Sequence, residues 1–471
     1  MTATHVGARG TVATDRETLL APLPTELPPV ERLAAIPSGF VAGASTCGIK
    51  ASGRPDLAVI ATTAGPAAAA GVFTRNAFAA APVRLSQAHL AATSAPGGGG
   101  WGRGRGIVST SGCANAATGP LGDADQLIVA RALASALGAP VEEVLCLSTG
   151  IIGSRLPVDR VVEGIAALVP TALSSDDAGL EAAAEALRTT DSRPKIATTS
   201  VALPDPDGQA VRSVRVTGIA KGVGMIHPGM ATMLSVVLTD AAVDPATLHE
   251  LLRRATVRTW NQLTVDGDTS TNDTVLVLAS GAVDTTEVVR GTGPARTLGA
   301  AIEAVARDLA RQQAADGEGA STLMTCQVSG AGDPAEARAV ARAVVASSLV
   351  KAAVHGRDPN WGRIAGAAGN ARLADAAVLE AAGLSADEAE RRGGRPVLVD
   401  PERLAIAIAG HPVFDGAAGG PLDHDRAAAR AAMGGPGVLI RIDLRLGTGA
   451  GEAFGCDLTE AYVRENSEYT T

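Results

Sequence analysis

Apolar residues recur along the chain with two different periods, which predict both strands and helices. Alternating apolar runs occur at residues 211–219 and 234–238, and both stretches predict a buried β-strand. A further strand is predicted at 144–153, with a break at Thr149 and Gly150. Spacings of three to four residues predict helices at 123–137, 182–188, 245–263, 296–315 and 334–355, and an apolar run that turns into alternation predicts a strand at 438–444.

The segment between the two central strands is rich in residues that bend the backbone. It contains Gly222, Gly224, Pro228 and Gly229 within eight positions of a region that is otherwise strand-like. Glycine permits positive φ and close backbone approach, and proline removes a hydrogen-bond donor. We therefore expect a bent connection here rather than a continuous strand.

Thr232 follows Ala231 at the end of this bend, an arrangement that a self-cleaving protein requires. The hydroxyl attacks the preceding carbonyl, the amide shifts to an ester, and water releases a new chain that begins with Thr232. The freed α-amine has a reference pKa of about 7.7–8, so it can act as general base for the adjacent hydroxyl. Spacing alone also fits an ordinary glycine-kinked strand with a β-forming threonine, which is the commoner arrangement.

Composition limits the classes of partner. The chain has 471 residues and 46% hydrophobic content, enough for two core-forming units, but aromatic residues are only 2%, so aliphatic residues must fill the cores. A net charge of −9 argues against nucleic acid or an anionic membrane surface as partner. Neither an apolar run of about 18 residues nor a secretory signal is visible. We expect a cytoplasmic protein with a flexible, proline-rich extension at 1–35.

Three patterns that could indicate a cofactor or a nucleic-acid site are incomplete. The five cysteines are widely spaced without a Cys-x-x-Cys pair, and the seven histidines form no His-x-x-x-His pair, so no metal or other cofactor is expected. The aspartates at 266–273 lack the glutamate that a calcium loop needs, which favours a polar turn. Residues 97–106 carry an Arg-Gly run with only two arginines, and we expect a flexible hairpin insertion there.

Residues 221–234 resemble the self-cleavage signature of the ArgJ family, the ornithine (glutamate N-) acetyltransferases of arginine biosynthesis. The pattern is Lys-Gly-x-Gly-Met-Ile/Leu-x-Pro-x-Met-Ala-Thr-Met-Leu, and this chain fits it at every fixed position, with Gly229 where a polar residue is expected. The resemblance runs from about residue 36 to the last residue. It implies an α/β fold with layered sheets of the ArgJ/DmpA type, and N-terminal-nucleophile chemistry.

The resemblance also implies an organisation and a reaction. Cleavage between Ala231 and Thr232 would give an α chain (36–231 after the extension) and a β chain (232–471), which stay associated, with a heterotetramer of two α and two β chains expected. Thr232 would take the acetyl group from N2-acetylornithine and pass it to glutamate in a ping-pong reaction. Some family members also use acetyl-CoA as donor, so a second, bifunctional activity stays open.

Site residues follow from the matching motifs. Thr149 and Gly150 match the oxyanion pair, and Thr232 matches the nucleophile. The positions that match substrate-binding residues are Thr189, Thr190, Lys221, Thr232, Glu318, Asn466 and Thr471. Taken alone, Lys221 is equally a solvated charge at a strand end, and Glu318 an exposed carboxylate in a loop.

Three other functions stay open at this point. Gly229, the insertion at 97–106, and Thr322 where lysine is expected fit an acetyltransferase recruited to a specialised metabolite. An N-terminal-nucleophile amidase or aminopeptidase would use water in place of glutamate. The last alternative is a non-enzymatic protein in which Thr232 never cleaves.

Overall fold

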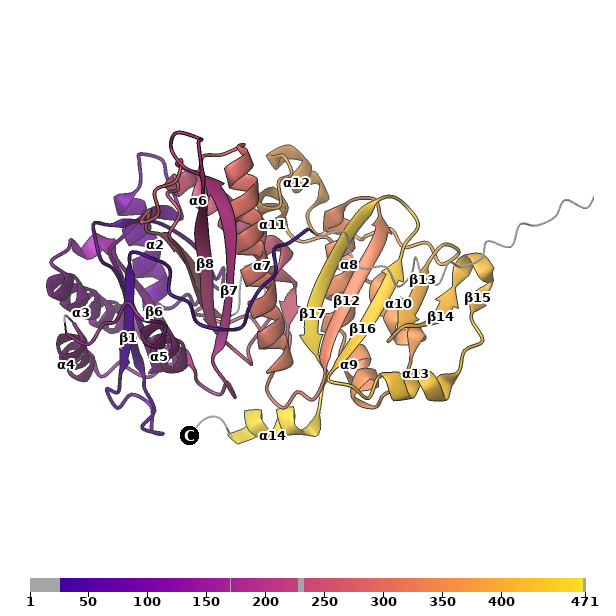
Figure 1. The fold of residues 1–471 in the computed structure, drawn as a ribbon. Coiled ribbons are helices and arrows are strands. Elements are labelled where there is room, and N and C mark those ends of the chain that lie inside the picture. The colour runs from indigo at the N-terminus through magenta and orange to yellow at the C-terminus, as the bar shows by residue number, and fades with distance from the viewer. Residues whose placement is uncertain (1–25, 170, 228–232, 469–471) are drawn as a thin grey trace, which may run out of the picture.

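The computed structural model describes residues 26–169, 171–227 and 233–468, which form three sheets (Figure 1). The central sheet has the strand order β4 (Trp101–Gly104), β3 (Ala67–Phe73), β11 (Thr274–Ala279), β9 (Leu234–Thr239), β8 (Val211–Lys221) and β7 (Lys195–Pro204). β8 and β9 are antiparallel neighbours, with Lys221 opposite Leu234. The two predicted central strands are therefore confirmed, and the described part of the glycine-rich segment, 222–227, follows directly after the end of β8.

A four-stranded sheet packs against one face of the central sheet. Its order is β1 (Phe40–Ser45), β2 (Leu57–Thr62), β5 (Gly106–Cys113) and β6 (Val144–Ile151). Aliphatic residues of both sheets and of helices α2 (Ala81–Thr93) and α5 (Asp177–Leu187) share one core. Helices α3 (Gly119–Leu137) and α4 (Val158–Leu168) cover the outer face of the four-stranded sheet.

Two helices cover the other face of the central sheet, α6 (Pro245–Arg258) and α7 (Gly293–Ala315). α6 begins where the Asp244 side chain accepts a hydrogen bond from the Thr247 backbone N–H. It ends five residues earlier than predicted, because the chain turns at Thr259 into a 3-10 turn at Trp260–Gln262. The predicted end was wrong since the fully buried Trp260 continues the apolar pattern beyond the helix.

The third sheet forms the other end of the molecule. Its order is β10 (Leu263–Thr264), β17 (Gly449–Cys456), β12 (Leu323–Ala331), β16 (Gly437–Asp443), β13 (Ala405–Ile408), β14 (His411–Asp415) and β15 (Gly420–Pro421). Successive β17 residues point to opposite faces of the sheet. Phe454 packs in the same hydrophobic core as α7, and Ala453 packs in the same hydrophobic core as α8. The remaining α-helices among the described residues are α8 (Pro334–Ala346), α9 (Ser348–His355), α10 (Trp361–Gly369), α11 (Ala376–Ala381), α12 (Ala386–Arg392), α13 (Arg426–Ala432) and α14 (Glu460–Glu468).

Two predictions about segments were wrong. The helix expected at 334–355 is two helices, because the Ser347 hydroxyl caps the start of α9 by accepting a hydrogen bond from Val350 N–H. The expected hairpin at 97–106 does not form, since β4 pairs with β3 while β5 pairs with β2 in the other sheet. Of the extension predicted at 1–35, residues 1–25 lie outside the described residues, and Glu31 forms an isolated β-bridge with Thr198 of β7.

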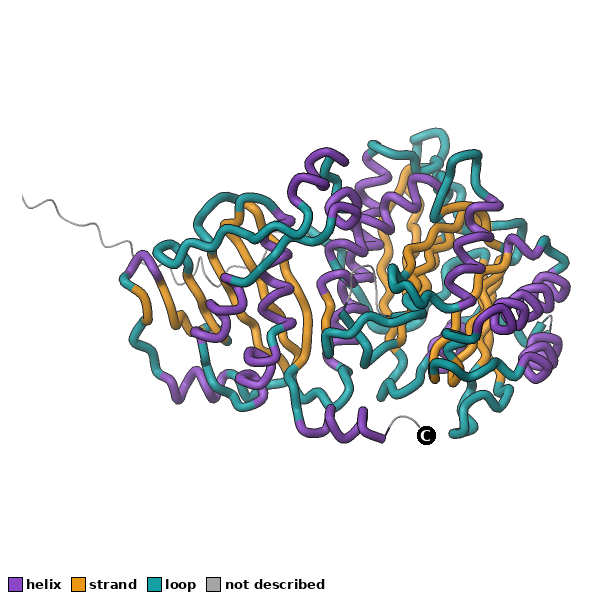
Figure 2. The backbone as a smooth tube through the Cα atoms, turned by 180° about the vertical axis from the view of Figure 1, so that it is seen from behind, coloured by secondary structure: helices purple, strands orange, loops and turns teal. Residues whose placement is uncertain are grey.

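The α/β class with layered sheets is confirmed by this arrangement. In both backbone views α14 lies apart from the seven-stranded sheet and runs toward the other end of the molecule (Figures 1 and 2). Within the described ranges, none of the helices is both long and apolar enough to span a bilayer.

Candidate active site

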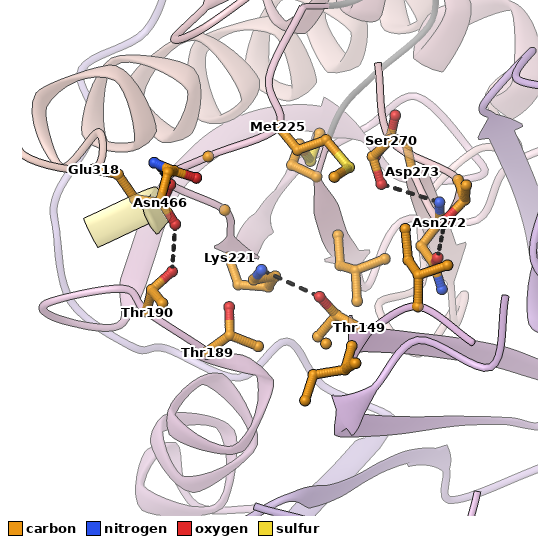
Figure 3. A pocket seen from close by; sticks show the side chains of 18 residues that line it. Thr149, Thr189, Thr190, Lys221, Met225, Ser270, Asn272, Asp273, Glu318 and Asn466 are labelled. Carbon is orange, nitrogen blue, oxygen red and sulfur yellow. Dashed lines mark hydrogen bonds between the residues drawn. The ribbon is translucent and has the colours of Figure 1, made fainter. Parts of the chain in front are cut away.

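A cavity of about 320 Å³ lies where β8 leaves the central sheet (Figure 3). Every predicted site residue that the structure describes lines it, namely Thr149, Gly150, Thr189, Thr190, Lys221, Glu318 and Asn466. Met233 and Leu234, the first described residues after the glycine-rich segment, line it as well. Ala231, Thr232 and Thr471 lie outside the described residues. Segments that are far apart in the sequence thus meet at one small-molecule-sized site.

Thr149 and Gly150 lie at the end of β6. β6 does not end at the predicted break but continues to Ile151. Its register with β5 becomes irregular just beyond the Gly112–Gly150 pair, at Cys113. Gly150 has φ +131°, and a Cβ at this position would lie 2.3 Å from the Gly112 carbonyl carbon. The backbones of β5 and β6 therefore approach so closely that only glycine fits.

Lys221 is the last residue of β8 and is 9% exposed. Its Nζ donates a hydrogen bond to Thr149 Oγ1 at 3.2 Å. Burial lowers the pKa of Lys221 below its usual range, and the neighbouring Asp191 carboxylate opposes part of that effect. Because the ammonium can only donate, Thr149 Oγ1 accepts this bond through one of its two lone pairs, and the Thr149 hydroxyl proton is available to donate to a ligand.

Glu318 is held by three elements that meet at the cavity. Its backbone N–H donates to Val223 O at 2.8 Å, just after α7 ends. Thr190 Oγ1 donates to Oε1 at 2.9 Å, and Asn466 Nδ2, from α14, donates to Oε2 at 3.0 Å (Figure 3). Gly224 leaves room for this carboxylate, since a Cβ there would lie 2.2 Å from Oε2. Glu318 is therefore a positioned carboxylate rather than a loose surface charge.

The polar turn predicted near residues 264–274 forms the opposite wall. Asn272 Nδ2 donates to Ala114 O at 2.7 Å and to Ser148 O at 2.8 Å, which fixes the strand end that carries Thr149. Asp266 Oδ1 accepts from the Ile226 backbone N–H at 2.9 Å. The turn thus holds both β6 and the described part of the bent segment in place.

A buried ion network beneath the cavity was missed by the sequence analysis. Lys195 Nζ is fully buried and donates to Asp191 Oδ1 at 2.6 Å and to Asp316 Oδ2 at 2.7 Å. Asp191 Oδ1 also accepts from the Gly222 backbone N–H at 2.8 Å. Burial alone would raise the pKa of Asp191, but Lys221 and Lys195 outweigh it and lower that pKa below its usual range. The network anchors Gly222, where the bend begins.

Asp191→Asn is expected to lower the free energy of unfolding by about 3–5 kcal/mol, the usual cost of breaking a buried ion pair. The folded-state pKa of Asp191 lies below the unfolded value of 3.8, so its stabilisation is present above about pH 4 and is lost as the pH falls through the folded pKa. Urea unfolding at pH 7 and pH 3 measures both effects. Asp387→Asn, on α12, is the control, and equal stability of the two variants would contradict the expectation.

Together these features define a class of layered α/β proteins with an amino-acid-sized site at the end of a central strand. The cavity is lined by a buried cation, Lys221, and by the carboxylates of Glu318 and Asp273. The sequence model of the ArgJ family matches residues 41–471. The chain belongs to the ArgJ family, as the resemblance of residues 221–234 predicted.

Curated relatives match along nearly the whole chain. The "arginine biosynthesis bifunctional protein ArgJ" of Thermus thermophilus is 44% identical over 436 residues, which are 93% of this chain and 99% of the relative. The protein of the same name from a Synechococcus species is 45% identical over 92% of this chain and 96% of its own. A solved chain of ornithine acetyltransferase complexed with ornithine, from Mycobacterium tuberculosis, is 38% identical over 43% of this chain and 99% of its own, with a TM-score of 0.37.

Proposed function

We propose that the protein moves an acetyl group from N2-acetylornithine to glutamate through an acetyl ester of Thr232, after self-cleavage between Ala231 and Thr232. One observation carries the proposal. The cavity contains a buried cation, Lys221, and a positioned carboxylate, Glu318, and it is also lined by Met233, the residue next to Thr232. A cation and a carboxylate facing one cavity complement the two charged ends of an amino acid.

The proposed reaction has two balanced halves. Thr232 Oγ attacks the acetyl carbonyl, its α-amine takes the hydroxyl proton, and that proton passes to the departing amine of ornithine. The free amine of glutamate then attacks the ester, and Thr232 Oγ leaves with the proton. The oxyanion formed in each half would accept hydrogen bonds from the Thr149 hydroxyl and the Gly150 N–H.

Substrate binding in this proposal uses both charged groups. Lys221 pairs with the α-carboxylate, and Glu318 attracts the cationic end of ornithine. Thr189, Thr190, Asn466 and Thr471 complete the substrate contacts, of which Thr190 and Asn466 orient the Glu318 carboxylate.

The finer parts of the proposal concern donor and assembly. Because the relatives are named bifunctional, the proposal includes acetyl-CoA as a second acetyl donor. The proposed reaction requires no cofactor. β8 and β9 pair along six residues in the middle of the central sheet, which supports α and β chains that stay associated after cleavage. The assembly that we propose is a cytoplasmic heterotetramer of two α and two β chains.

Acetyl transfer can be tested with purified protein, N2-acetylornithine and isotopically labelled glutamate. The expected products are ornithine and labelled N-acetylglutamate in equal amounts. Free acetate in place of N-acetylglutamate would instead support the amidase alternative. A preference for other amines over glutamate would favour specialised metabolism.

Glu318→Gln is expected to lower kcat/KM for N2-acetylornithine by about tenfold to 150-fold, the value of losing a hydrogen bond to a charged group. The amide keeps the size of the side chain but removes its negative charge. Steady-state kinetics with Glu465→Gln, an exposed glutamate beside Asn466 on α14, provides the matched control. Unchanged kinetics in Glu318→Gln would exclude Glu318 as a substrate-binding residue.

A further inference from the structure

A second cavity, of about 250 Å³, lies between α6, α8 and α11. Its walls are largely aliphatic, with alanines of α8 and the side chains of Leu373 and Leu379. Three arginines line it as well, Arg338 and Arg342 from α8 and Arg372 from the loop after α10. None of these arginines belongs to the acetyl-transfer site described above.

Two of these three arginines, Arg338 and Arg342, have no carboxylate paired with their charge among the described residues. Within the described ranges, neither the Arg338 nor the Arg342 guanidinium forms a hydrogen bond or an ion pair. Burial lowers the pKa of each to about 10. Nearby carboxylates, Asp333 and Glu303 for Arg338 and Asp375 for Arg342, oppose only part of that shift. A partly buried cation without a partner costs stability, because desolvation is not repaid.

The nearby carboxylates are engaged elsewhere. Asp375 forms an ion pair with Arg75, Asp333 forms one with Arg392, and Glu303 forms one with Arg258. The cavity therefore presents uncompensated positive charge beside apolar surface. Paired guanidinium groups in a concave site are suited to oxyanions, above all to phosphate, because each fork can donate two hydrogen bonds.

The two cavities are neighbours along the chain. His227 lines the arginine cavity and Met225 lines the acetyl-transfer cavity. Two residues of extended chain span at most about 7 Å. A donor that carries its phosphates on a long flexible arm can therefore place them in one cavity and its acyl group in the other.

We propose that this cavity, lined by Arg338, Arg342 and Arg372, binds the phosphate groups of a phosphate-bearing acyl donor of the acyl-CoA class. The proposal deepens the function proposed above and rests on it, since it assigns a place to the second acetyl donor. It requires no covalent step in the arginine cavity, which only binds and orients the distal part of the donor.

Isothermal titration of the purified full-length protein with CoA and, separately, with inorganic phosphate tests the site. The variants are Arg342→Met and the double variant Arg338→Met/Arg342→Met, with Arg430→Met, an exposed arginine on α13, as the control. CoA should bind the wild type and the control, about tenfold more weakly the single variant, and not measurably the double variant.

Two further measurements separate this site from folding and from the acetyl-transfer site. Without ligand, the thermal midpoints of the methionine variants should equal or exceed that of the wild type, because an unpaired cation has been removed. Transfer from N2-acetylornithine to glutamate should be unchanged in them. If neither the wild type nor any variant catalyses that transfer, the proposed function is refuted. The CoA titration would still test the arginine cavity independently of that result.

Three results would overturn the proposal. The first is no binding of CoA to the wild type. The second is equal CoA binding by the wild type and the double variant. The third is a split result, in which the arginine substitutions weaken the binding of inorganic phosphate but leave the binding of CoA unchanged. That result would assign the cavity to a free anion instead of an acyl donor.

Discussion

Thr232→Ala is expected to leave the protein as one unbroken chain and to lower acetyl transfer by about 10⁴–10⁶-fold, the usual range for loss of a catalytic nucleophile. Alanine has no hydroxyl to attack the Ala231 carbonyl, so no new amino terminus forms. Without cleavage there is neither a nucleophile nor the α-amine that serves as its base. Both losses follow from one missing oxygen atom.

Intact and denatured mass measurements of the purified protein check this expectation. The wild type should give two fragments that meet between Ala231 and Thr232, and Thr232→Ser, which keeps a hydroxyl, should still cleave. If Thr232→Ala cleaves as well, the nucleophile lies elsewhere. If the wild type stays whole, the N-terminal-nucleophile mechanism is excluded and the non-enzymatic alternative gains support.

Gly150→Ala is expected to lower acetyl transfer by at least about 10²–10³-fold, the effect of losing one oxyanion donor. The added Cβ would lie 2.3 Å from the Gly112 carbonyl carbon, a backbone atom that cannot rotate away. β5 and β6 must separate, and this displaces both the Gly150 N–H and the Thr149 hydroxyl. Alanine is also strained at φ +131°, at a cost of about 1–3 kcal/mol.

Gly153→Ala is the matched control for this second expectation. Gly153 also has positive φ, +84°, but a Cβ there would have no atom within 4 Å. The control variant therefore carries the backbone strain without the clash. Steady-state kinetics and thermal unfolding of both variants separate the two effects, and similar activity of Gly150→Ala and Gly153→Ala would refute the role of the close approach.

Several parts of this structure could be predicted because they depend on local patterns. The alternation at 211–219 and 234–238 depends on strands with buried faces, so β8 and β9 appear where expected. The glycines at 222 and 224 indicated a bend, and Gly222 indeed has φ +131°. The site residues were found through a family motif, not through any spacing, because they come from segments distant in the sequence.

Other parts depend on tertiary contacts that no local pattern contains. The Asp191–Lys195–Asp316 network joins residues up to 125 positions apart, and its only local trace is the spacing of four between Asp191 and Lys195. The start of α9 depended on one serine inside an otherwise helical apolar pattern. The arginine cavity exists because α6, α8 and α11 meet there, which the sequence does not reveal.

The pairing of β8 with β9 has a consequence for how a protein of two such chains can fold and assemble. If the halves were produced from separate genes, each would present an open central strand, the kind of exposed edge on which chains aggregate. Folding as one polypeptide places the two strands together before any bond is cut, so the interface never has to be found by diffusion. The proposed cleavage after folding would therefore also serve assembly, because the two strands are already paired when the chain is cut.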